Sequence, residues 1–106
     1  MVDDRHVSIK AHGETLVEAT ISPPDGDGEA RVDVHTESGH LPAGARQRMA
    51  DAIHEVATED EASRISATVP MGDAELVESI RNHLSDVELR AAGATSIIEG
   101  TVDSGS

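Results

Sequence analysis

Histidine and carboxylate residues gather in one short segment, VHTESGH, which contains His35, Glu37 and His40. Imidazole nitrogens and a carboxylate at this spacing can converge on Zn²⁺ or another divalent cation when a loop folds back on itself. No second segment of this kind occurs in the chain. A simpler interpretation makes His35 an outward-facing strand residue and His40 a loop residue before a helix. His35, Glu37 and His40 are therefore the metal-ligand candidates, and no other metal, cofactor or catalytic residue is predicted.

A second histidine motif lies near the amino terminus, at His6-Val7-Ser8-Ile9. It resembles one half of the paired His-x-Ser/Thr signature of the 2H phosphoesterases. The second copy is missing, because His35 is followed directly by Thr36 and places the hydroxyl one position early. Outward alternation on a strand accounts for His6 and Ser8 without any site.

Other catalytic signatures are missing from the sequence. The chain has no cysteine, which excludes disulfides, thiol nucleophiles and thiolate metal sites. It has no G-x-S-x-G elbow, no P-loop, and no G-x-G-x-x-G that follows a strand.

The clearest structural unit is a strand, turn and helix between residues 64 and 85. Apolar and polar residues alternate over 64–69, the period-2 pattern of a half-buried strand. Pro70 ends the strand because it has no N–H for the ladder. Asp73 stands where a helix N-cap is expected, and apolar residues recur at helical spacing over 73–85. Each residue of this turn thus has a structural role.

The remaining elements follow from the same two periods. Alternation predicts three strands at 6–12, 17–21 and 30–35, which form an antiparallel meander. It also predicts strand structure at 87–92 and 96–102, as one strand or two. An apolar stripe predicts a helix at about 42–57, with Pro42 in its first turn.

The predicted order is β-β-β-α-β-α-β, with or without a further strand. The expected fold is α+β: a single domain over 1–106 whose mixed or antiparallel sheet of five or six strands carries two helices on one face. Residues 1–4 and 103–106 are expected to be frayed.

One edge of the predicted sheet has features of known ligand-binding sites. The third and fourth strands both lead into helix starts, at 40–43 and 71–73. If these strands are parallel neighbours, the helix starts share the edge at which open α/β sheets bind ligands, and helix N-termini attract anions. Asp73 already places a negative charge at one of the two starts, which argues against a site there.

Charge restricts the partners of the protein. The chain has 21 Asp and Glu against 8 Lys and Arg, a formal net charge of −13. A nucleic-acid backbone or an anionic membrane surface is repelled by such a surface, so neither is a predicted partner. The chain also lacks Phe, Tyr and Trp, and Lys10 is its only lysine. In these features it resembles small acidic proteins of salt-in halophilic archaea, a compositional resemblance that implies molar salt but names no activity.

The sequence also gives expectations of location and function. Its amino terminus, MVDDRHV, lacks the pattern of a signal peptide, and no apolar run is long enough for a membrane span, so a cytoplasmic protein is expected. The sequence favours a non-enzymatic interaction or structural module, with self-association as a way to extend a small aliphatic core. The alternative is a small ligand- or metal-binding protein or enzyme that uses His35, Glu37 and His40.

Overall fold

A computed structural model describes residues 4–11, 13–26, 28–36, 44–71 and 73–102. Six strands and two helices follow one another as β1 (Arg5–Ala11), β2 (Glu14–Ile21), β3 (Glu29–Thr36), α1 (Ala45–Glu59), β4 (Arg64–Pro70), α2 (Ala74–Arg81), β5 (Leu84–Ala92) and β6 (Thr95–Val102). None of the described helices is long and apolar enough to cross a membrane.

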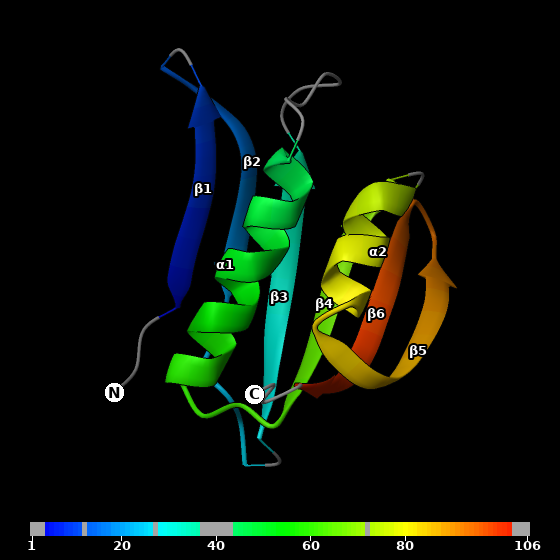
Figure 1. Cartoon of the computed structure of the whole chain (residues 1–106). Coiled ribbons are helices and arrows are strands. Elements are labelled where there is room, and N and C mark those ends of the chain that lie inside the picture. Colours follow the sequence, from blue (N-terminus) through cyan, green and yellow to red (C-terminus); the bar gives the residue numbers. More distant parts are fainter. Residues whose placement is uncertain (1–3, 12, 27, 37–43, 72, 103–106) are drawn as a thin grey trace.

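The strands form one mixed sheet in the order β1-β2-β3-β4-β6-β5. The pair β3–β4 is parallel, and each other neighbouring pair is antiparallel. Both helices lie on the same face of the sheet (Figure 1). The predicted α+β fold, its element order and its meander are confirmed, and the final segment proves to be two strands joined as a hairpin.

The core lies between the helices and the inward side chains of the sheet. Strand positions alternate between buried aliphatic residues and exposed or half-buried polar residues, as in β4, where Ile65, Ala67 and Val69 are buried. From α1, Met49 and Ile53 pack onto this layer. The buried residues among those described are all hydrophobic.

The structure moves the predicted helix boundaries. The first helix begins at Ala45 after Gly44, rather than at 42, and Pro42 lies outside the described residues. The second helix ends at Arg81 rather than at 85. Leu84 fits both a helical and a strand pattern, and pairing with Val102 on β6 places it in β5. Tertiary strand pairing therefore decides a segment that local periodicity leaves ambiguous.

A clamp holds the amino-terminal ends of the two parallel strands together. The Gly28 carbonyl oxygen accepts hydrogen bonds from the backbone N–H groups of Ser63, at 2.9 Å, and Arg64, at 3.2 Å. The clamp joins the turn before β3 to the start of β4. Gly28 has a φ of 79°, and a Cβ at this position would collide with the Ser63 hydroxyl.

Candidate functional site

The two parallel strands separate toward their carboxyl ends. Their pairing runs from Glu29 opposite Arg64 to Asp33 opposite Thr68, and stops there, although β3 and β4 both continue. Beyond this point β3 stays paired with β2, and β4 stays paired with β6. The sheet therefore consists of two halves, β1-β2-β3 and β4-β6-β5. The halves separate at the carboxyl ends of β3 and β4 and are held together at the amino-terminal ends of these two strands (Figure 1).

Both helices begin at the edge where the strands part, but their N-termini differ. The start of α1 is open: its N-cap is Gly44, with no side-chain hydrogen bond to the first turn and no acidic residue in that turn. The start of α2 is closed, because the Asp73 carboxylate accepts the N–H of Leu76 at 3.2 Å. The prediction that Asp73 is an N-cap is confirmed. Among the described residues, no side chain accepts the first-turn N–H groups of α1, which together with the positive dipole end favour an anion.

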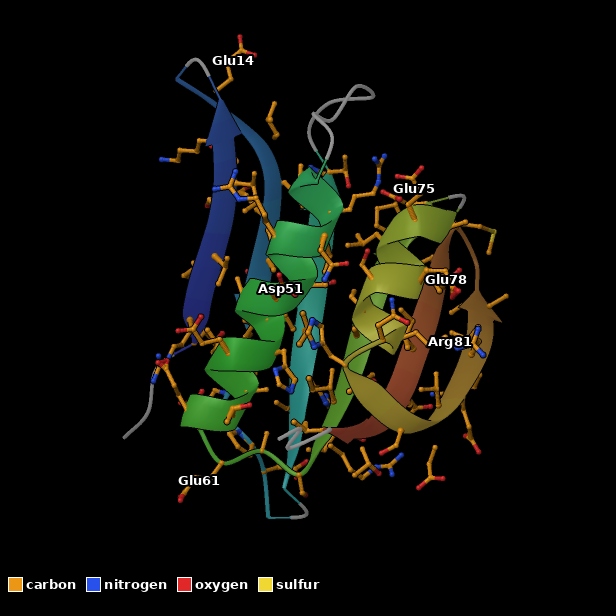
Figure 2. All side chains as sticks on the ribbon, viewed as in Figure 1. Glu14, Asp51, Glu61, Glu75, Glu78 and Arg81 are labelled. Carbon is orange, nitrogen blue, oxygen red and sulfur yellow. The ribbon has the colours of Figure 1, made fainter. Side chains whose placement is uncertain are left out.

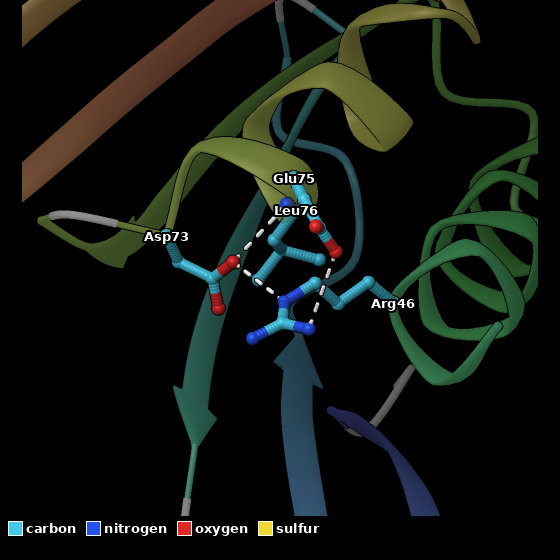
Figure 3. A network of polar contacts seen from close by, with 4 residues as sticks. All are labelled: Arg46, Asp73, Glu75 and Leu76. Carbon is cyan, nitrogen blue, oxygen red and sulfur yellow. Dashed lines mark hydrogen bonds and ion pairs between the residues drawn. The ribbon is translucent and has the colours of Figure 1, made fainter. Parts of the chain in front are cut away.

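Arg46, in the first turn of α1, links the two helix starts (Figure 3). Its Nε donates to Asp73 at 2.7 Å, and its Nη1 donates to Glu75 at 3.4 Å. The side chain of Asp73 is 11% exposed and that of Arg46 is 25% exposed, so this ion pair is partly shielded from water. The Asp73 charge is thereby balanced by Arg46 as well as by the α2 dipole.

A buried hydroxyl lies at the end of β3. Thr36 Oγ1 is buried without a hydrogen-bond partner among the residues that the structure describes. Leaving such a group unpaired costs about 1–3 kcal/mol, so a partner beyond the described residues is expected for it. Thr36 is the last residue of β3, beyond the point where pairing with β4 stops.

A hollow of about 570 Å³ opens beside the parting strands. Its wall contains polar residues from the sheet face that bears no helix, together with apolar residues at the parting and at the β5–β6 turn: His6, Glu18, Thr20, Asp33, Val34, His35, Thr68, Pro70, Ala94 and Thr95. Val34 is buried on the helix-facing side of β3 and still borders the hollow. The hollow therefore reaches into the gap between the two halves of the sheet.

A second group of polar residues joins α1 to the segment after α2. The rings of His54 and His83 stack with their centroids 4.5 Å apart, and His83 Nε2 lies 2.7 Å from Asp51 Oδ1. The hydrogen bond from His83 is the main cause that lowers the pKa of Asp51. The pair ties the helices together, and it lies on the helix-bearing face, whereas the hollow opens on the other face.

The metal candidates are only partly within the described structure. His35 borders the hollow, whereas Glu37 and His40 lie outside the described residues. No group of three potential metal ligands occurs among the described residues. Binding of a metal by His35, Glu37 and His40 stays a prediction.

The sequence reasoning missed the residues that the fold brings to the hollow. In the sequence, Glu18 and Asp33 are two of the polar positions that alternate with apolar ones along the strands. Cross-strand register decides their proximity, because Glu18 lies opposite His35 and Thr20 lies opposite Asp33. The sequence does show polar outward positions on adjacent strands. This pattern does not show which residues of the two strands lie opposite each other.

Comparison with solved structures identifies relatives of this fold. The GNAT domain of S. lividans PAT superposes with a TM-score of 0.66 at 16% identity, covering 95% of this chain and 62% of that one. A putative acetyltransferase from Salmonella typhimurium with its cofactor acetyl-CoA gives 0.66 at 10% identity, covering 97% and 67%. A GNAT-superfamily phosphinothricin acetyltransferase from Sinorhizobium meliloti in complex with AcCoA gives 0.66 at 11%, covering 97% and 63%.

The chain has the fold of these GNAT acetyltransferases. It spans about 62% of the length of the S. lividans domain. No protein-family model and no curated protein sequence matches the chain. The matches overturn the preferred sequence interpretation, a non-enzymatic interaction module, because the solved structures with this fold include acetyltransferases. They support the alternative, an enzyme or ligand-binding protein.

Proposed function

We propose that this protein binds acetyl-CoA at the edge where β3 and β4 part, and transfers the acetyl group to an amine. The parting of the strands beside the open start of α1 carries the proposal. Acetyl-CoA combines a 3′-phosphorylated adenosine diphosphate, an amide-containing arm and a thioester. These three parts need an anion site, hydrogen-bonding backbone and a passage to the acceptor. Two of the structures with this fold are complexes with acetyl-CoA, which supports the assignment.

The residues of the edge fit each part of this ligand. The N–H groups in the first turn of α1 suit phosphate oxygens, and Arg48 in the same turn adds positive charge, whereas the charge of Arg46 is balanced by Asp73. Beyond Asp33, the β3 edge that faces β4 is not paired with it, so its backbone groups are available to amides. The Thr36 hydroxyl gives the same arm a partner and resolves the unsatisfied group.

The hollow on the other face suits the acceptor. Bound acetyl-CoA supplies an acetyl group activated as a thioester. An amine attacks only in its neutral form, so a group near the strand gap must accept its proton. The new C–N bond replaces the thioester C–S bond, and CoA leaves as a thiolate that takes up a proton. We assign this role to an imidazole nitrogen of His35, since His35 lies on β3 next to the gap and borders the hollow. His6, two strands away, lies farther from the gap and shares a 3.3 Å contact with Thr20.

The surroundings in which the protein works belong to the same proposal. We place the activity in the cytoplasm of a salt-accumulating cell, on the strength of the net charge of −13 and the single lysine. Its acids are spread over the surface: Glu14, Glu61 and Glu75 project from distant parts of the molecule (Figure 2). Molar salt screens the repulsion between them.

Thr36→Val tests the cofactor site. The replacement is nearly isosteric and removes the unpaired hydroxyl, so the free protein should keep its stability or gain some. Loss of one hydrogen bond to the ligand should weaken acetyl-CoA binding about two- to tenfold in isothermal titration calorimetry. Thr101→Val, at the far end of the sheet, is the control and should leave the affinity unchanged. If the wild-type protein binds no acetyl-CoA in either dilute or molar KCl, the proposal is wrong.

A further inference from the structure

We infer that the hollow of about 570 Å³ selects a small amine that carries a second positive charge and no anionic group. This inference rests on the proposed function, because it treats the hollow as the acceptor site of that reaction. It concerns the charge of the acceptor, which the fold leaves open.

Two carboxylates give the hollow its charge. Glu18 on β2 and Asp33 on β3 both border it, on the face without helices. The register makes them diagonal neighbours, for which about 7–8 Å is the usual separation. Neither carboxylate forms an ion pair or hydrogen bond with the residues that the structure describes. Other acids do, as Glu99 pairs with Arg90 at 2.8 Å and Asp60 pairs with Arg5 at 2.9 Å.

Within the part of the chain that the structure describes, no lysine or arginine borders this hollow. Arg31 borders an adjoining hollow of about 320 Å³, which shares Thr20, Asp33 and Thr68 with the first. A cation between Glu18 and Asp33 is thus attracted, whereas a cation that extends farther meets the opposite charges of Arg31 and Asp4. The distribution of charge favours a short acceptor with one ammonium group at the strand gap and a second near the two carboxylates.

The same arrangement disfavours amines that carry a carboxylate or phosphate. An anionic group near the amine would lie beside Glu18 and Asp33 with no arginine or lysine of the wall to balance it. Hydroxyl groups of Thr20 and Thr68 offer hydrogen bonds to either kind of ligand and do not discriminate between them. Charge, rather than shape, is therefore the basis of the expected selection.

Three amines of similar length separate the effect of charge from that of size. Cadaverine has an ammonium group at both ends, pentylamine has one ammonium and a methyl end, and 5-aminovalerate has an ammonium and a carboxylate. Calorimetric titration into the intact protein without acetyl-CoA should give the order cadaverine, pentylamine, 5-aminovalerate. The measurement uses the lowest KCl concentration that keeps the protein folded, since molar salt screens the ion pairs.

Two charge-removing variants test the residues. Glu18→Gln and Asp33→Asn should each weaken cadaverine binding about two- to fivefold and leave pentylamine binding nearly unchanged. Glu14→Gln removes the same charge at the β1–β2 turn and should alter neither affinity. The inference is overturned if 5-aminovalerate binds as tightly as cadaverine, or if the two variants bind cadaverine like the wild-type protein.

The test of amine selection and the test of acetyl-CoA binding can fail independently of each other. Acetyl-CoA binding without discrimination among the three amines would refute the inference and leave the cofactor site intact. Selective cadaverine binding without acetyl-CoA binding would refute the acetyltransferase proposal and support the charge selection of the hollow. Thr36→Val, which changes acetyl-CoA affinity alone, should leave cadaverine binding unaffected.

Discussion

Asp73 has two roles at the start of α2, and two substitutions separate them. Its carboxylate caps the helix by accepting the Leu76 N–H, and it pairs with Arg46 of α1. Asp73→Ala removes both the cap and the charge. Asp73→Asn removes the charge and keeps a side chain that is as good an N-cap as aspartate. The difference between the variants therefore measures the cap.

The magnitudes follow from the geometry. Loss of an N-cap costs about 1 kcal/mol. A partly shielded pair at 2.7 Å contributes up to about 1 kcal/mol, the upper end of the range for surface pairs, because both side chains are mostly buried. Asp73→Ala should thus lower the free energy of unfolding by about 2 kcal/mol, and Asp73→Asn by about 1 kcal/mol. In a domain of this size the melting temperatures should fall by about 10 °C and 5 °C.

Thermal and urea unfolding followed by circular dichroism, in molar KCl, gives these values. Glu75→Gln is the matched control, because Glu75 is 82% exposed and reaches Arg46 at only 3.4 Å; its effect should stay below about 0.5 kcal/mol. Asp73→Asn should also strengthen acetyl-CoA binding a few-fold in dilute salt, since it releases Arg46 beside the α1 start. If Asp73→Asn and Asp73→Ala lower the free energy of unfolding equally, the Asp73 side chain does not stabilise α2 as an N-cap. If Asp73→Asn leaves the acetyl-CoA affinity unchanged, Arg46 does not contribute to acetyl-CoA binding.

Three further predictions concern stability. Gly28→Ala should destabilise the protein more than Gly13→Ala in urea unfolding, because both glycines have φ near 80° but only Gly28 has a side chain, that of Ser63, in the way of a Cβ. The melting temperature should rise with KCl into the molar range, as screening relieves repulsion among the acids; a flat profile would contradict the halophilic interpretation. The hydrogen bond from His83 lowers the pKa of Asp51, so its contribution is present above the ordinary value of 3.8 and is lost as the pH falls below it. Melts of wild type and Asp51→Asn should differ at pH 6 and converge at pH 3.

Local patterns were sufficient to predict most of the fold. Alternation over residues 64–69, the proline stop and the Asp73 cap are short-range features, and the structure confirms each of them. The end of α2 was misplaced because Leu84 satisfies two patterns, and only its pairing with Val102 selects the strand. Strand order could not be predicted, because the hairpin β5–β6 places β6, not β5, next to β4.

The candidate site could not be predicted from local patterns in the same way. The expectation that two helix starts share an edge was correct, since β3 and β4 are parallel neighbours. Asp73 argues against an anion site only at the α2 start, whereas the α1 start has no acidic cap. Gly44 has no side chain to cap a helix, and a glycine at this position predicts from the sequence a helix start without a side-chain cap. Glu18 and Asp33 meet only through the β2–β3 register, which depends on the whole sheet.

The distribution of charge connects the two parts of the proposed site. A protein with a net charge of −13 repels an anionic cofactor over most of its surface, so binding requires a local exception. The first turn of α1 provides one, because it has no acidic residue, Arg48 adds positive charge, and Arg46 neutralises the neighbouring Asp73. On the opposite face Glu18 and Asp33 are left unpaired among the described residues, where a cation gains from them. The strand gap thus separates a site suited to an anion from one suited to a cation, the arrangement that joining acetyl-CoA to an ammonium-bearing acceptor requires.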